Sequence, residues 1–206
     1  QGLGYLGNAA SNIAFPLTSM CLAIGLLTGI GAAAHFNLNI GRKDYKRAQQ
    51  FLGTAFGFLL LIGCILALLL YFNASYLVRF FGASDQVYPY ALPYFKTLSF
   101  GVPFLILTIG GSNLVRSDGA AKYSMMAVLF GAILNTILDP LFIFVFGWGM
   151  AGAAWATVIG QWASGLMILA YIPRFSQVAF SYSDLNLSLS TYWKIAQLGL
   201  NSLVFQ

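Results

Sequence analysis

Charge is the scarcest feature of this 206-residue chain, which has ten Lys and Arg, five Asp and Glu, and one His. Charged residues make up 7% of it, whereas an average soluble domain carries about 25%. Because 59% of the residues are hydrophobic, too few polar side chains remain to cover a water-soluble globule of this size. The composition therefore argues against a soluble enzyme and a disordered chain. The net charge is +5, but the basic residues lie between apolar runs and are not clustered on one solvated face. This distribution argues against a nucleic-acid partner.

Residues that usually carry catalysis or bind metals are also scarce. The two cysteines, Cys21 and Cys64, lie inside apolar runs without a nearby histidine, which is typical of small buried side chains. The single histidine, His35, lies near the end of an apolar run, where an interfacial position is the simpler interpretation. No phosphate-binding loop or nucleotide-binding fingerprint is present. We therefore expect no enzymatic activity and no cofactor.

Long apolar runs are what the sequence has in abundance. A helix needs about 20 mostly apolar residues to cross a hydrocarbon core of about 30 Å. Five segments reach that length, at residues 9–36, 51–72, 93–114, 124–146 and 153–172, and a sixth begins near Tyr192. Their lengths favour helices over the shorter alternating strands of a membrane β-barrel. We predict an all-α polytopic membrane bundle with about five complete transmembrane helices, as part of a longer protein.

Basic residues fall mainly on one side of this predicted bundle. Eight of them lie in alternate joints or at their edges: Arg42, Lys43, Lys46, Arg47, Arg116, Lys122, Arg174 and Lys194. The other side has only Arg79 and Lys96. Since basic loops stay in the cytoplasm, we expect the loops at 41–50, 115–122 and 174–191 to be cytoplasmic. We divide the chain into a bundle over 1–174, a connector over 175–191, and the start of a further helix over 192–206.

Asp139 is the one acidic side chain deep inside an apolar segment. The other four acids lie in polar joints or the connector: Asp44, Asp85, Asp118 and Asp184. A charge at the bilayer centre costs at least about 2.5 kcal/mol, so such residues face a bundle interior or a cavity and usually serve transport.

Two neighbours of Asp139 strengthen the functional interpretation. Asn135, one turn earlier, points the same way, and Pro140 leaves the carbonyl of Thr136 without its usual helical partner. These oxygens suit Na⁺ or an exchangeable proton, either of which would remove the charge and let the helix bend at Pro140. The alternative is a carboxylate that only supports a helix kink.

A short connection over residues 147–152 predicts an antiparallel hairpin between the fourth and fifth segments. At 1.5 Å per residue, Thr157 should lie at a depth comparable with that of Asp139. Thr157, Gln161 and Ser164 share one helical face, so this polar stripe can meet the acidic face of the fourth segment. A membrane threonine often bonds its own backbone, whereas a glutamine amide at that depth needs a partner.

Several motifs in this order resemble one transporter family. The runs from Asn135 to Phe144 and from Gly147 to Thr157 resemble the fifth and sixth helices of multidrug and toxic compound extrusion (MATE) transporters. The stretch from Arg116 to Lys122 resembles the segment after the family's fourth helix. The stretch from Gly41 to Ala48 resembles its loop between the second and third helices.

The resemblance implies twelve helices in two six-helix lobes, with an outward V-shaped cleft. Such proteins export cationic or amphiphilic small compounds in exchange for Na⁺ or H⁺, and this export can confer antibiotic resistance. This chain would supply helices two to six and the start of seven. The family's first helix, which carries another acidic residue, and the second lobe would be its partners, together with membrane lipid.

By the same resemblance, Asn135 and Asp139 correspond to the family's cation or proton site, and Thr157 corresponds to its partner on the sixth helix. Tyr94 corresponds to a tyrosine at the outer end of the fourth helix. We expect an antiporter of the bacterial inner membrane in which Asp139, Asn135 and Thr157 hold the coupling ion, Na⁺ or H⁺.

Two alternatives remain open. A flippase for lipid-linked precursors, from the same superfamily, usually needs a strongly cationic cavity, and no basic residue lies deep in a segment here. A structural or channel-like membrane subunit would show no coupling to an ion gradient.

Overall fold

The computed structural model describes the backbone of residues 2–204 and the side chains of residue 9 and residues 11–201. Within the described backbone, every regular element is helical, which confirms the predicted all-α class. The elements are α1 (Gly2–Gly41), α2 (Tyr45–Phe72), α3 (Ala74–Phe80), α4 (Tyr88–Ser99), α5 (Val102–Ser117), α6 (Ala121–Pro140), the π-helical turn η1 (Leu141–Val145), α7 (Gly149–Tyr171), the 3₁₀ turns η2 (Ile172–Arg174) and η3 (Tyr182–Asp184), and α8 (Leu189–Val204).

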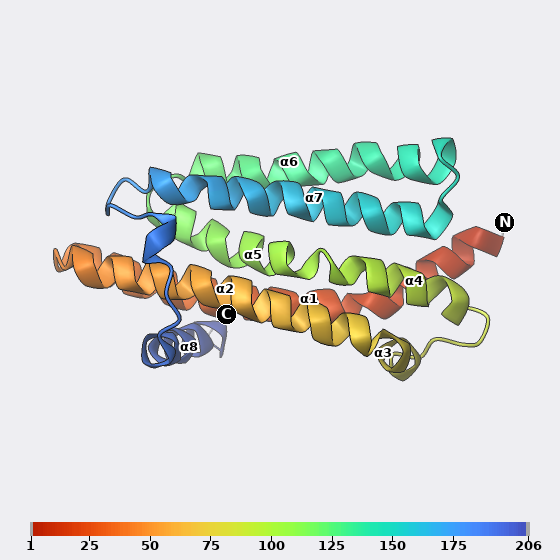
Figure 1. Cartoon of the computed structure of the whole chain (residues 1–206), viewed down its shortest axis with the longest axis horizontal. Helices are drawn as coiled ribbons and strands as arrows, with labels where there is room; N and C mark the ends of the chain where they lie inside the picture. Colours follow the sequence, from red (N-terminus) through yellow and green to blue (C-terminus); the bar gives the residue numbers. More distant parts are fainter. Residues whose placement is uncertain (1, 205–206) are drawn as a thin grey trace.

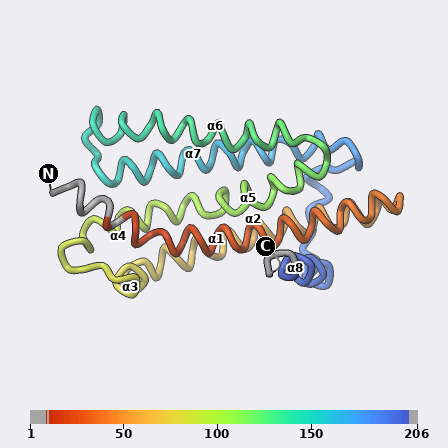
Figure 2. Tube along the Cα trace, turned by 180° about the vertical axis from the view of Figure 1, so that it is seen from behind, coloured from red at the N-terminus to blue at the C-terminus, as the bar shows by residue number. Residues whose placement is uncertain are grey.

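The long helices run side by side along the longest axis of the molecule (Figure 1). The α6–α7 hairpin forms one side and α1 with α2 forms the other, while α5 lies between them and contacts all four. In contrast, α8 crosses the bundle and is seen nearly end-on from the front and from behind (Figures 1 and 2). Helix α5 is therefore the central helix of the bundle.

In the described part of the chain, four helical stretches are long and apolar enough to span a membrane: Ser11–Gly41, Tyr45–Phe72, Ala121–Val145 and Gly149–Arg174. The segment predicted at 93–114 is instead the pair α4 and α5, bent by 52° across a short break, and this pair makes a fifth span if it is counted as one. Pro103 lies in the first turn of α5 and has no N–H to continue the hydrogen bonds of α4. The chain therefore starts a new helix there.

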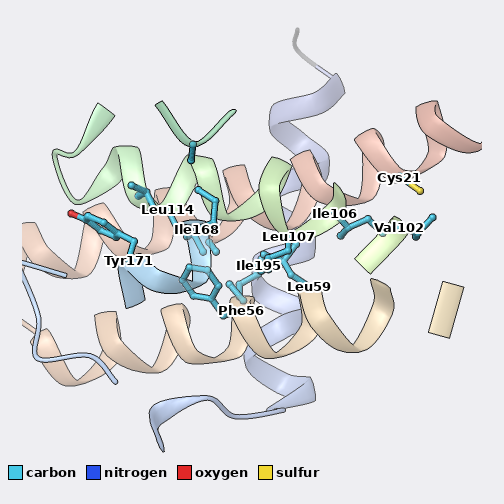
Figure 3. Packing of buried hydrophobic residues seen from close by; sticks show 14 of the residues in the cluster. Cys21, Phe56, Leu59, Val102, Ile106, Leu107, Leu114, Ile168, Tyr171 and Ile195 are labelled. Carbon is cyan, nitrogen blue, oxygen red and sulfur yellow. The ribbon is translucent and has the colours of Figure 1, made fainter. Parts of the chain in front are cut away.

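The buried hydrophobic core extends across α1, α2, α5, α7 and α8 (Figure 3). Phe56, Leu59, Leu107, Ile168 and Ile195 have no exposed surface there. Helix α6 differs, because its outer face carries exposed apolar side chains: Met125, Met126, Leu129, Phe130, Ile133 and Ile137. Such a face suits hydrocarbon and not water.

The predicted connector is held firmly against the bundle. The Thr54 hydroxyl donates a hydrogen bond of 2.6 Å to the side-chain oxygen of Asn186. A Cβ at Gly53 would overlap the carbonyl oxygen of Asp184, so the absence of a side chain lets the connector lie directly on α2. The connector therefore packs as a strap along α2.

Asp118, which follows α5, fixes the other end of this connector. Its carboxylate is only 5% exposed and accepts hydrogen bonds from the Tyr171 hydroxyl at 2.7 Å, the Ser176 N–H at 2.8 Å and the Gln177 N–H at 3.0 Å. We call these four residues the Asp118 anchor. From the sequence we expected an acid in a polar joint, whereas here it is a buried acceptor that ties the α5–α6 turn to the chain after α7.

Helix α8 packs across α1 at two glycines. A Cβ at Gly31 would overlap the carbonyl oxygen of Ile195, and one at Gly199 would overlap that of Leu27. Small residues of this kind let two helical backbones approach closely. At 16 residues, α8 is not among the described helices long enough to span a membrane. Its assignment as the start of the next lobe stays an expectation.

Candidate functional site

The α6–α7 hairpin positions most of the predicted site. Gly147 and Gly149 adopt positive φ angles of 68° and 53°, a backbone conformation that glycine accepts without strain, and they turn the chain back. Further along, a Cβ at Gly131 of α6 would overlap the carbonyl oxygen of Gly160 and the hydroxyl of Ser164 on α7. The two helices are therefore antiparallel and in close contact, as the short connection predicted.

This close packing brings two predicted site residues together. The Asn135 side-chain amide donates a hydrogen bond of 3.4 Å to the Thr157 hydroxyl, which in turn donates to the carbonyl oxygen of Ala153 at 3.0 Å. Thr157 thus makes the backbone bond expected of a membrane threonine and also accepts a bond from the neighbouring helix. The polar faces of α6 and α7 meet at this pair.

Asp139 lies in the last turn of α6. It is one helical turn beyond Asn135, toward the connection between α6 and α7. Its side chain is half-buried, and its Oδ1 is a buried atom without a hydrogen-bond partner in the described part of the chain. Tyr94 of α4 interacts electrostatically with Asp139 and forms a hydrogen bond with Ser11 of α1. Tyr94 therefore links Asp139 of α6 with Ser11 of α1.

The backbone changes form directly after Asp139. Helix α6 ends at Pro140, and η1 continues it with wider spacing, in which the Phe146 N–H reaches back five residues to the carbonyl oxygen of Leu141 at 3.1 Å. Proline supplies no N–H for a regular α-helical bond, and π-helical turns occur frequently at functional sites. The predicted kink position is thus a local widening of the helix, and its bending during function stays a prediction.

Gln161 contacts the break between α4 and α5. Its Oε1 is buried without a hydrogen-bond partner among the described residues and lies against Gly101, where a Cβ would overlap it. The adjacent Trp162 donates from Nε1 to the carbonyl oxygen of Phe100 at 3.0 Å. The Gln161 side chain, for which we expected a hydrogen-bond partner, therefore reaches the break in the α4–α5 pair. Its Oε1 still accepts no hydrogen bond from the described residues.

A cavity of about 440 Å³ lies between α1, α5, α6 and α7. Asn135 and the whole predicted stripe of Thr157, Gln161 and Ser164 line it. A smaller cavity of about 180 Å³ lies between α1, α4, α5 and α7 and is lined by Tyr94. Thr157 and Gln161 line both cavities, so the α7 stripe separates the large cavity from the surroundings of Tyr94.

The face that α5 contributes to the larger cavity was not predicted from the sequence. Thr108, Ser112 and Arg116 line it, and the Ser112 hydroxyl, in a side chain 2% exposed, has no hydrogen-bond partner among the described residues. These residues are four apart, so helical periodicity applied to this segment would have found them. Arg116 was expected in a cytoplasmic joint, and it also lines this cavity.

The described residues contain no group of three or more His, Cys, Asp or Glu side chains that could hold one metal ion. The predicted set of Asp139, Asn135 and Thr157 offers one carboxylate, one amide and one hydroxyl. Oxygen ligands of this kind suit hard cations. The arrangement is therefore chemically suited to exchange a proton at Asp139 or to bind a monovalent coupling cation.

Gly131→Ala should loosen this hairpin. The added Cβ meets a backbone carbonyl, so α6 must move away from α7, and overpacking of this kind costs about 1–3 kcal/mol. We expect a lower thermal unfolding midpoint in detergent and lower transport. Gly41→Ala is the matched control, because nothing lies within 4 Å of its new Cβ. Equal midpoints for the two variants would contradict the packing described above.

The chain matches known proteins over most of its length. Residues 2–141 match the MatE family model. Multidrug export protein MepA of Staphylococcus saprophyticus is 28% identical over 85% of this chain and 40% of its own length. MepA of Staphylococcus aureus strain MSSA476 is 28% identical over 82% of this chain and 38% of its own. The chain thus spans less than half the length of these relatives.

Solved structures give the same result. A crystal structure of MATE in the bent conformation superimposes with a TM-score of 0.88, at 27% identity, over 98% of this chain and 45% of that one. A multidrug resistance MATE family transporter in an inward-facing conformation gives 0.86, at 27% identity, over 96% and 45%. The family model, the relatives and the helical bundle agree, and we conclude that this chain belongs to the MatE family and is integral to the membrane.

Proposed function

We propose that the protein containing this chain is a secondary active efflux transporter that exports cationic or amphiphilic small compounds in exchange for Na⁺ or H⁺. The observation that carries this proposal is Asp139, whose buried Oδ1 has no hydrogen-bond partner among the described residues, although it interacts electrostatically with Tyr94 of α4. A lone carboxylate in an apolar bundle is costly, and binding a proton or a cation removes the cost. Asp139 is therefore the coupling group.

The surroundings of Asp139 supply a route from ion binding to cargo. Neutralising the carboxylate changes the balance of forces at the α6–η1 junction, where regular helical bonding is already interrupted. Movement there acts on α7, whose Thr157 and Gln161 line both cavities. We infer that binding of the ion on one side and release of cargo on the other alternate through this hairpin, as alternating access requires.

The larger cavity sets the class of cargo. Its polar groups are amides and hydroxyls among apolar side chains, and Arg116 is the one basic residue among its described lining residues. A flippase for lipid-linked precursors would require a more cationic lining. An amphiphilic compound fits this mixture better, and the multidrug export names of the relatives support the same class. We place the protein in a bacterial inner membrane, with the 41–50, 115–122 and 174–191 loops facing the cytoplasm.

The experiment is transport by the full-length protein in proteoliposomes. An imposed pH or Na⁺ gradient should drive movement of ethidium, a cationic and amphiphilic probe, and collapsing that gradient with an ionophore should stop it. The two gradients, applied separately, identify the coupling ion. Ethidium movement that ignores both gradients would contradict coupling and would favour a channel-like subunit.

Thr157→Val should weaken ion coupling without abolishing it. The change removes the hydroxyl that accepts from Asn135, and one hydrogen bond is worth about 1 kcal/mol, so the apparent ion affinity should fall about 5-fold. The concentration of H⁺ or Na⁺ that half-saturates transport measures this effect. Thr136→Val is the matched control, because that exposed hydroxyl bonds only the carbonyl oxygen of Ala132 among the described residues. Equal affinities for both variants would remove Thr157 from the site.

A further inference from the structure

A polar pocket of about 420 Å³ lies where the end of α1, the start of α2 and the start of α8 meet. Three basic side chains line it, Arg42, Arg47 and Lys194, together with the polar side chains of Asn39, Gln50 and Thr191. It is separate from the cavities around Thr157, with which it shares no lining residue.

The positive charge of this pocket is only partly balanced. Arg47 pairs with Asp44 at 3.4 Å, and both side chains are partly exposed. Neither Arg42 nor Lys194 takes part in the two salt bridges found among the described residues. Arg42 and Lys194 are therefore two exposed cations in a pocket whose described lining residues include no carboxylate, beside the side-chain amide of Gln50.

Close contacts between side chains form the inner wall of the pocket. His35 stacks on Phe51 with ring centroids 4.4 Å apart, and its Nε2 lies 3.2 Å from the carbonyl oxygen of Lys194. Gln50 donates to the Thr191 hydroxyl at 3.5 Å. These contacts join α1, α2 and α8, so a ligand in the pocket would touch three helices already held together.

Exposed apolar and aromatic residues accompany the basic ones at this pocket. Leu38 lines it and is 48% exposed. Tyr45 and Trp193, close in sequence to the lining residues Arg42 and Lys194, are also exposed. Exposed aromatic side chains beside basic ones are typical of the membrane–water interface. An occupant of this pocket would have anionic groups next to Arg42 and Lys194 and hydrocarbon next to Leu38.

We propose that this pocket binds the phosphate headgroup of an anionic phospholipid, with an acyl chain along the outer face of α1. Phosphate oxygens accept hydrogen bonds from guanidinium, ammonium and amide donors, all of which are present. Basic pockets between membrane helices on the cytoplasmic side recognise such headgroups. The bound lipid bridges α1, α2 and α8 and so stabilises the position of α8 against the bundle.

The test uses the full-length protein, purified in detergent and titrated with dioleoylphosphatidylglycerol, with dioleoylphosphatidylcholine or with inorganic phosphate. Phosphatidylglycerol should raise the thermal unfolding midpoint in a saturable manner, because a ligand that binds the folded state stabilises it. Phosphatidylcholine and inorganic phosphate should not. In Arg42→Gln/Lys194→Gln, the apparent Kd for phosphatidylglycerol should rise about 30-fold, on the usual contribution of each basic side chain near such a headgroup.

Lys46→Gln/Lys122→Gln is the control, because it removes the same charge from the same side of the bundle outside this pocket. It should keep wild-type affinity for phosphatidylglycerol. An equal loss in both double variants would show diffuse surface attraction, and an equal response to inorganic phosphate would show a soluble-anion site. Either result, or unchanged binding in the pocket variant, overturns the proposal. If the pocket double variant does not fold, Lys194→Gln alone gives the same test with an expected rise of about 5-fold.

Discussion

Asp139→Asn should abolish ion-coupled efflux by the full-length protein while leaving its amount in the membrane unchanged. Asparagine has nearly the shape of aspartate, so the packing of α6 against α7 is preserved. It does not take up a proton and carries no charge for a cation to neutralise, so the step that couples the ion to movement is lost. In an efflux-deficient bacterium, ethidium resistance should fall to the level of the empty vector, with equal protein by immunoblot.

Asp85→Asn is the matched control for this experiment. Asp85 is also an acid, but its side chain is 92% exposed and pairs with Arg79 at 3.4 Å, far along the chain from the hairpin. Exposed pairs contribute little to stability, so resistance should stay at the wild-type level. Full resistance in Asp139→Asn would refute its assignment as the coupling group and favour the purely structural role.

Asp118→Ala should have the largest effect on stability. The carboxylate accepts from the N–H groups of Ser176 and Gln177 and from the Tyr171 hydroxyl, and its removal leaves those donors without a partner. Hydrogen bonds to a charged group are worth about 1.5–3 kcal/mol each, so we expect a loss of at least about 3 kcal/mol in the free energy of unfolding. Size-exclusion profiles and thermal unfolding in detergent measure it.

Asp44→Ala provides the comparison for Asp118→Ala. Asp44 caps α2 by accepting from the Arg47 N–H, and loss of such a cap costs about 1 kcal/mol. The Asp118 variant should therefore unfold at a clearly lower temperature than the Asp44 variant. Ion-coupled transport per folded molecule should stay normal in both, because neither residue lies at the α6–α7 site. Similar unfolding temperatures would show that the anchor contributes little.

The sequence was sufficient for the all-α class and for four of the five predicted spans, because the cost of exposing backbone polar groups to lipid leaves few alternatives. It was not sufficient for the break between α4 and α5. Residues 93–114 are mostly apolar on both sides of the break, whereas the break depends on a missing N–H at Pro103 and on Phe100 and Gly101 packing against α7. Helix α3 was missed because seven residues hold too few turns to show a period.

Some contacts of the candidate site could also be predicted from the sequence, and others could not. The pairing of Asn135 with Thr157 could be predicted from helical spacing and one short connection, since both are local properties. The contact of Gln161 with Gly101 and the burial of Asp118 join residues about 60 positions apart, which spacing within one helix does not reveal. The roles of Asp139 and Tyr94 stay predictions until the variants are measured.

The Asp118 anchor also limits the order of events during synthesis. Ser176 follows Asp118 by 58 residues, and ribosomes add about 5–20 residues per second, so the carboxylate waits about 3–12 s for its first backbone donor. The whole α6–α7 hairpin is synthesised in that interval, because its residues lie between Asp118 and Ser176. The anchor is therefore a late contact, which can form only after both helices of the hairpin have been made.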